Sequence, residues 1–191
     1  NIADFSGRIY KEANRLGNLV ADIIQLSRLD EQQDAVVSME SVELDELAKD
    51  VVNNLRDHAE KKNISLDYCG IPINIQGVRH VLYEMLNNIA DNAVRYTNPG
   101  GHIHIYVGRK GDRPFYRVED DGIGIPKSEQ KRIFERFYRV DKSHSRQTGG
   151  TGLGLAITRN VVLMHKGSIR VHSKEGEGAT FIIRIPLNYI S

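Results

Sequence analysis

The stretch from Thr148 to Ile157, Thr-Gly-Gly-Thr-Gly-Leu-Gly-Leu-Ala-Ile, restricts the fold of this 191-residue chain more than any other segment. It holds four glycines within six positions and runs directly into a helical pattern. The backbone amides of such a loop can close on an anion, and the N-terminus of the following helix adds a partial positive charge. The segment predicts either a phosphate-binding loop or a flexible connector before a glycine-rich helix start.

The familiar phosphate motifs do not match this loop. Gly149 and Gly154 have the spacing of a P-loop. The next two residues, Leu155 and Ala156, stand where a P-loop requires Lys and Ser/Thr. The dinucleotide fingerprint Gly-x-Gly-x-x-Gly also fails, because Leu155 and Ile157 occupy the place of its third glycine. If the loop binds a nucleotide, it belongs to another fold.

The composition is that of a soluble globular protein, with 40% apolar and 27% charged residues. A net charge of +1 favours neither nucleic acid nor an anionic membrane as a partner. Cys69 is the single cysteine, which excludes an intrachain disulfide and fits a reducing cytosol. No apolar run approaches the roughly 20 residues that span a bilayer. Because residue 1 is Asn within a helical pattern, we expect the chain to be a piece of a longer protein.

Residues 2–29 predict one long amphipathic helix of roughly 40 Å. Its apolar positions alternate by three and four, as in a heptad repeat, with one interruption at Glu12: Ile2, Phe5, Ile9, Leu16, Leu19, Ile23 and Leu26. Such a helix is not stable alone in water, so it needs either a partner helix or a surface of its own domain. A polar stretch from 30 to 41 separates it from the rest of the chain.

The remaining periodicities predict an α/β sandwich with two layers. Helices are expected at 41–61, 78–96, 127–140 and 151–165, and strands at 64–68, 102–107, 115–119, 168–173 and 179–186. Four or five strands would form a mixed sheet, with three packed helices on one face.

The helix at 78–96 carries a polar flank beside its apolar stripe. Glu84, Asn88, Asn92 and Arg95 follow one another at i, i+4, i+8 and i+11. Amide and carboxylate oxygens suit Mg²⁺, and a guanidinium suits phosphate. The alternative is a solvated flank with one ion pair.

A second polar signal follows the strand that ends near Glu119. Asp120 and Asp121 lead into Gly122-Ile-Gly124, which lets a flat group approach the backbone. An ionised Asp120 is an acceptor only, so it can accept a hydrogen bond from the exocyclic amine of adenine. The alternative is a plain Asp-Gly turn.

Four segments follow in order: Asn88 and Asn92 on a helix, Asp120-x-Gly-x-Gly124 after a strand, Phe134-Glu-Arg-Phe-Tyr-Arg139, and Gly150-x-Gly-x-Gly154 opening a helix. In this order they resemble the N, G1, F and G2 boxes of the ATP-binding catalytic domain of sensor histidine kinases. That domain has the Bergerat-type fold, which it shares with DNA gyrase, a heat-shock chaperone and mismatch-repair proteins. The resemblance covers about residues 42–188, and residues 12–30 resemble the second helix of the kinase dimerisation hairpin.

The resemblance implies three parts of the chain. Residues 1–33 would be the second helix of the dimerisation and histidine-phosphotransfer hairpin, 34–41 a linker, and 42–191 the catalytic domain. The cofactors would be ATP and Mg²⁺.

At the adenine end of the site, the resemblance gives Asp120 the role of reading the adenine amine. Gly122 and Gly124 would make room for the base, and Ile125 would lie beside it. Thr180, which follows Gly-Glu-Gly-Ala, would complete the base pocket.

At the phosphate end, the resemblance makes Asn92 the Mg²⁺ ligand and places Asn88 at the phosphates. Arg95 and Tyr96 would contact the phosphates and the adenine side, and Arg139 would reach the γ-phosphate. Asn88, Arg95 and Arg139 would be the catalytic residues.

A lid at 141–150 would close over the nucleotide. Phe134 and Phe137 would anchor it, and its end would rest against the phosphates through Gly150, Thr151, Gly152, Leu153 and Gly154. We expect residues 141–150 to be the least ordered part of the domain without nucleotide.

The chain departs from the family pattern in two ways. None of its seven histidines is followed by an acidic residue, as the phosphoacceptor would be, so we expect the first dimerisation helix to be missing from this piece. Asn88 stands where the gyrase-like branch carries the glutamate that activates water. Direct hydrolysis of ATP should therefore be slow, and transfer to a histidine fits better.

The sequence thus predicts the catalytic core of a two-component sensor histidine kinase. Its partners would be ATP, the receiver domain of a response regulator, and a second copy bound through the helical hairpin, with no nucleic acid. The domain would be cytoplasmic, and the membrane would be reached through segments outside this chain. The alternative is an ATP-binding module or ATPase of the same fold without histidine kinase activity.

Overall fold

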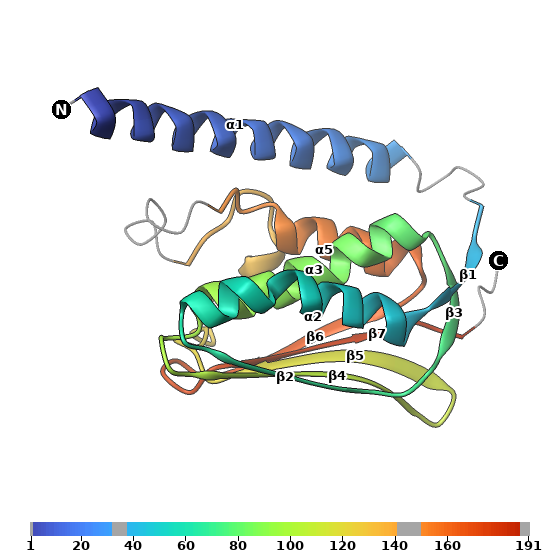
Figure 1. Cartoon of the computed structure of the whole chain (residues 1–191). Coiled ribbons are helices and arrows are strands. Elements are labelled where there is room, and N and C mark those ends of the chain that lie inside the picture. The colour runs from blue at the N-terminus through green and yellow to red at the C-terminus, as the bar shows by residue number, and fades with distance from the viewer. Residues whose placement is uncertain (1, 32–37, 141–149, 188–191) are drawn as a thin grey trace.

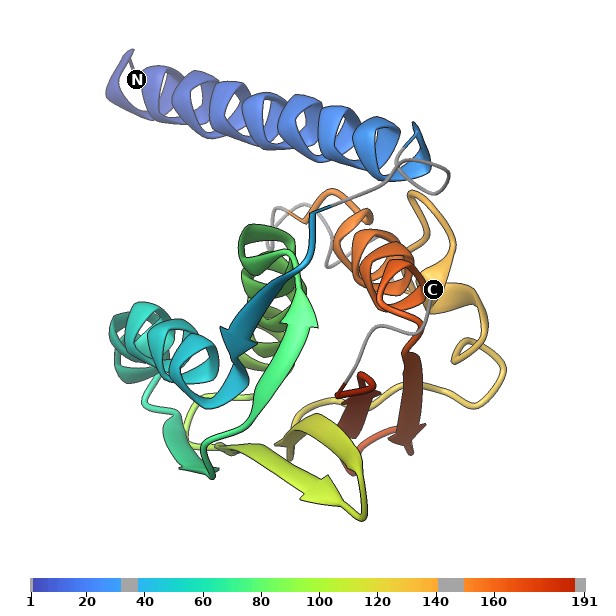
Figure 2. The same ribbon diagram turned by 90° about the vertical axis from the view of Figure 1, so that its right-hand side faces the viewer.

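A computed structural model describes residues 2–31, 38–140 and 150–187. The helix α1 (Ile2–Glu31) lies across the outside of a two-layer α/β sandwich (Figure 1). The helical layer of the sandwich consists of α2 (Leu44–Lys61), α3 (Arg79–Tyr96) and α5 (Gly154–Met164). In Figure 2 these three helices lie between the sheet and α1. The predicted fold class, including its leading amphipathic helix, is confirmed.

The sheet of the sandwich is mixed and has five strands in the order β2-β4-β5-β7-β6. β2 runs parallel to β4, and the other neighbours are antiparallel. The strands are β2 (Ser65–Gly70), β4 (His102–Lys110), β5 (Arg113–Asp120), β6 (Ser168–Ser173) and β7 (Ala179–Arg184). Cys69 is exposed on β2, and β6 forms the opposite edge.

Alternating side chains explain why these segments form strands. Ile103 and Ile105 of β4 are fully buried, as are Tyr116 and Val118 on the neighbouring β5. Their side chains all point to the helical layer, where they meet the apolar stripe of α3. A strand with one buried face alternates apolar and polar residues in this way, so the pattern was readable from the sequence.

A second, two-stranded sheet was not predicted. β1 (Glu40–Glu43) pairs antiparallel with β3 (Asn74–Gly77), and both Val42 and Ile75 are buried. The helix predicted to start at 41 therefore begins at Leu44. Four residues hold too little alternation to be recognised, and this pairing depends on contacts between segments about 35 residues apart in sequence.

The helix predicted at 127–140 is wrong. Most of this segment is turns and irregular backbone, with a single 3₁₀ helix, η1 (Arg132–Phe134). Phe137 has φ 63°, in the left-handed region, and its N–H donates to the carbonyl of Gly152 at 3.0 Å. A tertiary hydrogen bond therefore takes the place of the helical one, which sequence periodicity does not reveal.

In the part of α1 whose side chains the structure describes, the apolar stripe meets the domain towards the C-terminal end of the helix. Leu26 is 5% exposed and belongs to the core, and Leu19 packs against it. Other stripe residues remain exposed, with Phe5 at 67%. Packing against its own domain thus accounts for only part of the stripe. None of the helices in the described residues combines the length and apolar character needed to cross a bilayer.

Candidate functional site

The carboxylate of Asp120, at the end of β5, lies at the centre of the predicted adenine end. Its Oδ1 accepts hydrogen bonds from the backbone N–H of Gly122 at 3.0 Å and of Ala179 at 3.3 Å. No residue that the structure describes donates to its other oxygen, Oδ2. Burial raises the pKa of Asp120 to about 6, against the opposing effect of the two backbone bonds. A half-buried acceptor oxygen is therefore available to a ligand.

The loop after Asp120 is fixed by close backbone contacts that only glycine allows. A Cβ at Gly122 would lie 2.4 Å from the carbonyl oxygen of Tyr96. At Gly124, where φ is 68°, it would lie 2.0 Å from the carbonyl oxygen of Lys174. Between them, the N–H of Ile123 donates to the Tyr96 carbonyl at 3.1 Å. This loop is thus held against the end of α3 on one side and the β6–β7 turn on the other.

Ser173 and Gln130 hold the far side of this loop. The N–H of Ile125 donates to the Ser173 hydroxyl at 2.7 Å, and that hydroxyl donates to the carbonyl of Gly178 at 2.6 Å. The amide of Gln130 donates to the carbonyls of Ile125 and Ser173 at 3.0 and 2.7 Å. Neither side chain was singled out from the sequence, because each acts through bonds to distant backbone.

The Thr180 side chain does not lie with the groups that surround the Asp120 carboxylate. Ala179 pairs with Asp120 in the β5–β7 register, whereas Thr180 pairs with Glu119. Successive side chains of a strand point to opposite faces of the sheet. The Thr180 side chain therefore lies on the face away from Asp120, and the prediction that it completes the base pocket does not fit. The backbone of Ala179 contacts Asp120 instead.

The predicted phosphate end brings α3 and the start of α5 together. The amide nitrogen of Asn88 donates to the carbonyl of Gly154 at 3.3 Å. One turn further along α3, Asn92 is half-buried on the same flank. Arg95 binds Asp91 at 2.8 Å through its Nε. The flank therefore presents two amides and a guanidinium beside the glycine loop, as the sequence predicts.

Gly150 lies between the two predicted phosphate-binding arginines. A Cβ built on it would lie 3.2 Å from Nη1 of Arg95 and 3.7 Å from Nη2 of Arg139. Arg139 also donates to the Gly150 carbonyl. Two guanidinium groups that converge on a glycine backbone form a suitable site for an anion.

Lys62, just beyond α2, binds the C-terminal end of α3, a contact that the sequence did not predict. Its ammonium donates to the carbonyls of Val94, Arg95 and Thr97 at 2.7, 2.9 and 3.0 Å. Burial lowers the pKa of Lys62. A cation at the C-terminus of a helix satisfies its free carbonyls and complements its dipole. More than 30 residues separate Lys62 from these carbonyls in sequence, so no local pattern indicates the contact.

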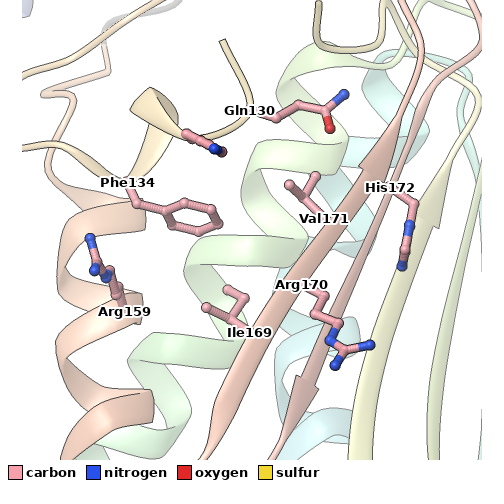
Figure 3. Close-up of a pocket in the computed structure, with 8 residues that line it drawn as sticks. Gln130, Phe134, Arg159, Ile169, Arg170, Val171 and His172 are labelled. Atoms are coloured by element: carbon pink, nitrogen blue, oxygen red, sulfur yellow. The ribbon is translucent and has the colours of Figure 1, made fainter. Parts of the chain in front are cut away.

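The start of α5 is fixed by the segment that contains Phe137. Gly152 has φ 75°, and a Cβ there would lie 3.0 Å from the carbonyl carbon of Phe137. Leu153 is fully buried, so its side chain is part of the core. Phe134 is half-buried, and its ring points towards β6 (Figure 3). Leu153 and Phe134 thus anchor this region through packing.

Thr151 connects the glycine loop to α1. Its hydroxyl donates to the carboxylate of Asp22 at 2.6 Å and accepts from the N–H of Leu153 at 3.3 Å. Burial raises the pKa of Glu84 on α3; the charge of His80 opposes this shift and that of Asp22 adds to it. The long helix therefore contacts the same loop that is predicted to meet the phosphates. The predicted lid at 141–150 lies outside the described residues except for Gly150.

The family model of the histidine kinase-, DNA gyrase B- and HSP90-like ATPases matches residues 77–189, which include all the predicted boxes. The chain belongs to this ATPase family. It is 39% identical over 184 residues to the sensor-like histidine kinase SenX3 of Mycobacterium tuberculosis, a match that covers 95% of this chain and 44% of SenX3. It is 32% identical to the sensor protein kinase WalK of Staphylococcus aureus, over 94% of this chain and 44% of that protein. The chain thus spans less than half the length of these relatives.

Solved structures of histidine kinases resemble the fold. The mycobacterial sensor histidine kinase MprB superimposes with a TM-score of 0.69 at 27% identity, over 80% of this chain and 99% of that chain. Full-length ShkA in complex with AMPPNP gives a TM-score of 0.80 at 26% identity, over 99% of this chain and 39% of ShkA. These matches confirm the resemblance to the ATP-binding domain of sensor histidine kinases, which was inferred from the order of the boxes.

Proposed function

We propose that this chain is the catalytic part of a two-component sensor histidine kinase. The arrangement of polar groups around the α3–α5 junction carries the proposal. Asp120, with a free acceptor oxygen, lies at one end, and Arg95 and Arg139 converge on Gly150 at the other. A nucleotide needs such a pair, one group for the base and one for the phosphates. The curated relatives are sensor kinases, and ShkA was solved with AMPPNP, an analogue of ATP.

In this proposal each predicted residue keeps its role except Thr180 and Phe137. The Phe137 side chain is 59% exposed, so this residue anchors the region only through its backbone bond to Gly152. Asp120 accepts the adenine amine, and Gly122 and Gly124 let the base approach. Asn88, Asn92, Arg95 and Arg139 bind the phosphates, and the backbone from Gly150 to Gly154 closes on them. Tyr96 and Ile125 border the base.

The donor atoms at the phosphate end suit Mg²⁺. Asn88 and Asn92 offer neutral amide oxygens, which are hard donors. Among the described residues there is no cluster of three His, Cys, Asp or Glu side chains that could hold a metal without a ligand. Mg²⁺ commonly uses one or two protein donors together with substrate phosphates, so Asn92, with Asn88, would hold it only with ATP. When bound, the ion would neutralise phosphate charge.

The chemical step is transfer of the γ-phosphoryl group to an imidazole nitrogen. The nitrogen attacks phosphorus, the bond between phosphorus and the bridging oxygen breaks, and ADP leaves. Arg95 and Arg139 stabilise the charge on the transferred group. Asn88 cannot remove a proton from water as a carboxylate would, so hydrolysis has no base at that position. The acceptor histidine would lie on the first dimerisation helix.

The same proposal assigns the parts of the chain. Residues 1–33 act as the second helix of the dimerisation hairpin, 34–41 as a linker and 42–191 as the catalytic domain. The exposed stripe of α1, including Phe5, Ile9 and Leu16, is then available to the first helix and to a second copy. The phosphohistidine would pass its phosphoryl group to the receiver domain of a response regulator. ThkA, a structural neighbour at 23% identity with a TM-score of 0.76, was solved with its response regulator TrrA.

A transfer assay tests this proposal. The chain is mixed with a separately made helical hairpin that carries the acceptor histidine, together with Mg²⁺ and ATP labelled at the γ-position. Label on the hairpin that resists base and is lost in acid is the result expected of phosphohistidine. Rapid release of labelled inorganic phosphate without protein label would instead support the ATPase alternative. The Asn92→Ala variant serves as the control and should lose the label.

A further inference from the structure

A pocket of about 450 Å³ lies between η1, α5 and the edge strand β6 (Figure 3). Asp120, Asn88, Asn92, Arg95 and Arg139 are not among its lining residues. It therefore lies beside the proposed nucleotide site and shares with its surroundings Gln130, which holds the loop after Asp120, and Phe134. Its lining residues are Gln130, Lys131, Phe134, Arg159, Ile169, Arg170, Val171 and His172.

The lining combines an apolar floor with a cationic rim. Phe134, Ile169 and Val171 are half-buried and form the floor, as Figure 3 shows. Three exposed cations surround this floor: Lys131 at the start of η1, Arg159 on α5, and Arg170 on the opposite face of β6 (Figure 3). None of them forms an ion pair with a described residue. None of the lining residues is acidic. The surface is thus complementary to a ligand that carries both aliphatic groups and negative charge.

The backbone of β6 offers further binding groups. β6 pairs with β7 on one side and has no strand on the other among the described residues. The Ser173 carbonyl accepts a hydrogen bond from the side-chain amide of Gln130, so this carbonyl points away from β7. In an antiparallel strand, the N–H and C=O of one residue point to the same side, and the side alternates along the strand. Ile169 and Val171 therefore direct their backbone groups outward as well, towards the open edge.

We propose that β6 and this pocket bind an extended, acidic peptide segment of a partner protein, which adds to the sheet as a sixth strand. Because side chains of a strand alternate between the two faces of the sheet, the surroundings of each face set the sequence pattern of that segment. Side chains beside Ile169 and Val171 enter the pocket and must be aliphatic, whereas those on the opposite face lie beside Arg170 and must be acidic. Arg184, diagonal to Arg170 on the same face, adds to the positive charge there. This inference does not depend on the proposed kinase activity.

A blocked heptapeptide, Glu-Val-Glu-Val-Glu-Val-Glu, is the probe. Its binding is measured by NMR on isotope-labelled protein saturated with ATP and Mg²⁺, so that the proposed phosphate site is occupied. We expect shifts of the amides in β6, η1 and α5, and none with Lys-Val-Lys-Val-Lys-Val-Lys. Arg170→Glu should weaken binding of the acidic peptide by about fivefold or more, because like charges then face each other across the strands. Arg109→Glu, an exposed arginine at the end of β4, is the matched control and should leave the affinity unchanged.

Two N-methylated versions of the peptide test the added strand itself. Alternate N–H groups of a strand point to opposite edges, so methylation of one set removes the bonds to β6 and methylation of the other does not. Loss of binding with one set alone supports the proposal. Equal binding by both versions, no effect of Arg170→Glu, or shifts that map to Arg95 and Arg139 would each overturn it. Dimerisation of the protein through β6 that excludes the peptide would assign the edge to a second copy instead.

Discussion

The Asp120 end of the candidate site is held by backbone groups, whereas the Arg139 end is held largely by side chains. Around Asp120, glycine backbones lie so close to the carbonyls of Tyr96 and Lys174 that no Cβ fits. Around Gly150, the nearest atoms are the ends of two long arginine side chains, which can move. The first end is therefore preformed for a rigid base, and the second can adjust to a chain of phosphates.

This difference separates effects on folding from effects on binding. Side chains added to the glycine backbone at the Asp120 end should disturb the fold, because close backbone contacts between this loop, α3 and the β6–β7 turn leave no room for a Cβ. Changes at the Gly150 end should leave the fold intact and alter affinity or transfer.

The largest expected effect is that of Gly124→Ala. The new Cβ would meet the Lys174 carbonyl at 2.0 Å in a left-handed backbone, so we expect a loss of at least about 2 kcal/mol in the free energy of unfolding. Gly150→Ala, whose Cβ meets a movable guanidinium, should cost less than about 1 kcal/mol. Urea denaturation measures both. Similar losses for the two variants would contradict the contrast.

Next in size is the effect of Asp120→Asn on nucleotide affinity. Loss of a charge-assisted hydrogen bond to the base should weaken ATP binding by about 10- to 100-fold in calorimetry. Asp121→Asn is the matched control, because the exposed Asp121 carboxylate accepts from the backbone N–H of His102 and does not face the site. An unchanged affinity in Asp120→Asn would refute the assignment of the base pocket.

Lys62→Met, which changes neither the Asp120 end nor the Gly150 end of the site, should lower the free energy of unfolding moderately. Removal of the ammonium leaves three carbonyls at the end of α3 without their donor, so the free energy of unfolding should fall by about 1–3 kcal/mol. Lys61→Met, which changes an exposed neighbour, should cost little. Denaturation of both variants gives the comparison, and equal stabilities would show that this cap is unimportant.

The smallest expected effect is a dependence on pH. The folded-state pKa of Asp120 is raised to about 6, so the ionised carboxylate opposes folding at neutral pH. Stability relative to Asp120→Asn should therefore rise as the pH falls from about 6 towards about 4, the ordinary pKa of Asp. ATP affinity should fall by up to about tenfold between about pH 7 and pH 5, because the protonated group loses its charge.

Comparison with Asp120→Asn isolates this effect, since the phosphates of ATP titrate in the same range and do so for both proteins. A parallel pH profile for the two proteins would assign the change to the ligand alone.

Sequence reasoning succeeded where the determinant was local. The strands at β4 and β5 follow from alternation over many residues, and the polar flank of α3 follows from helical spacing. It failed where distant backbone decides the outcome. Phe137 leaves the helical region to bond Gly152, and Lys62 binds carbonyls on another helix. Thr180 has a residue type that suits the base pocket, but the register places its side chain on the other face.

The topology of the sheet also governs when the site can form during synthesis. β5 leaves the ribosome about 60 residues before β7, its partner. Until then the Asp120 carboxylate cannot accept its hydrogen bond from the N–H of Ala179. Gly178, which packs on the Asp120 backbone, arrives at the same late moment. A nascent chain that stops before residue 178 therefore lacks a finished base pocket, although α3 and both arginines are already present. Nucleotide binding should thus be acquired only after Gly178 and Ala179 have been synthesised and β7 has paired with β5.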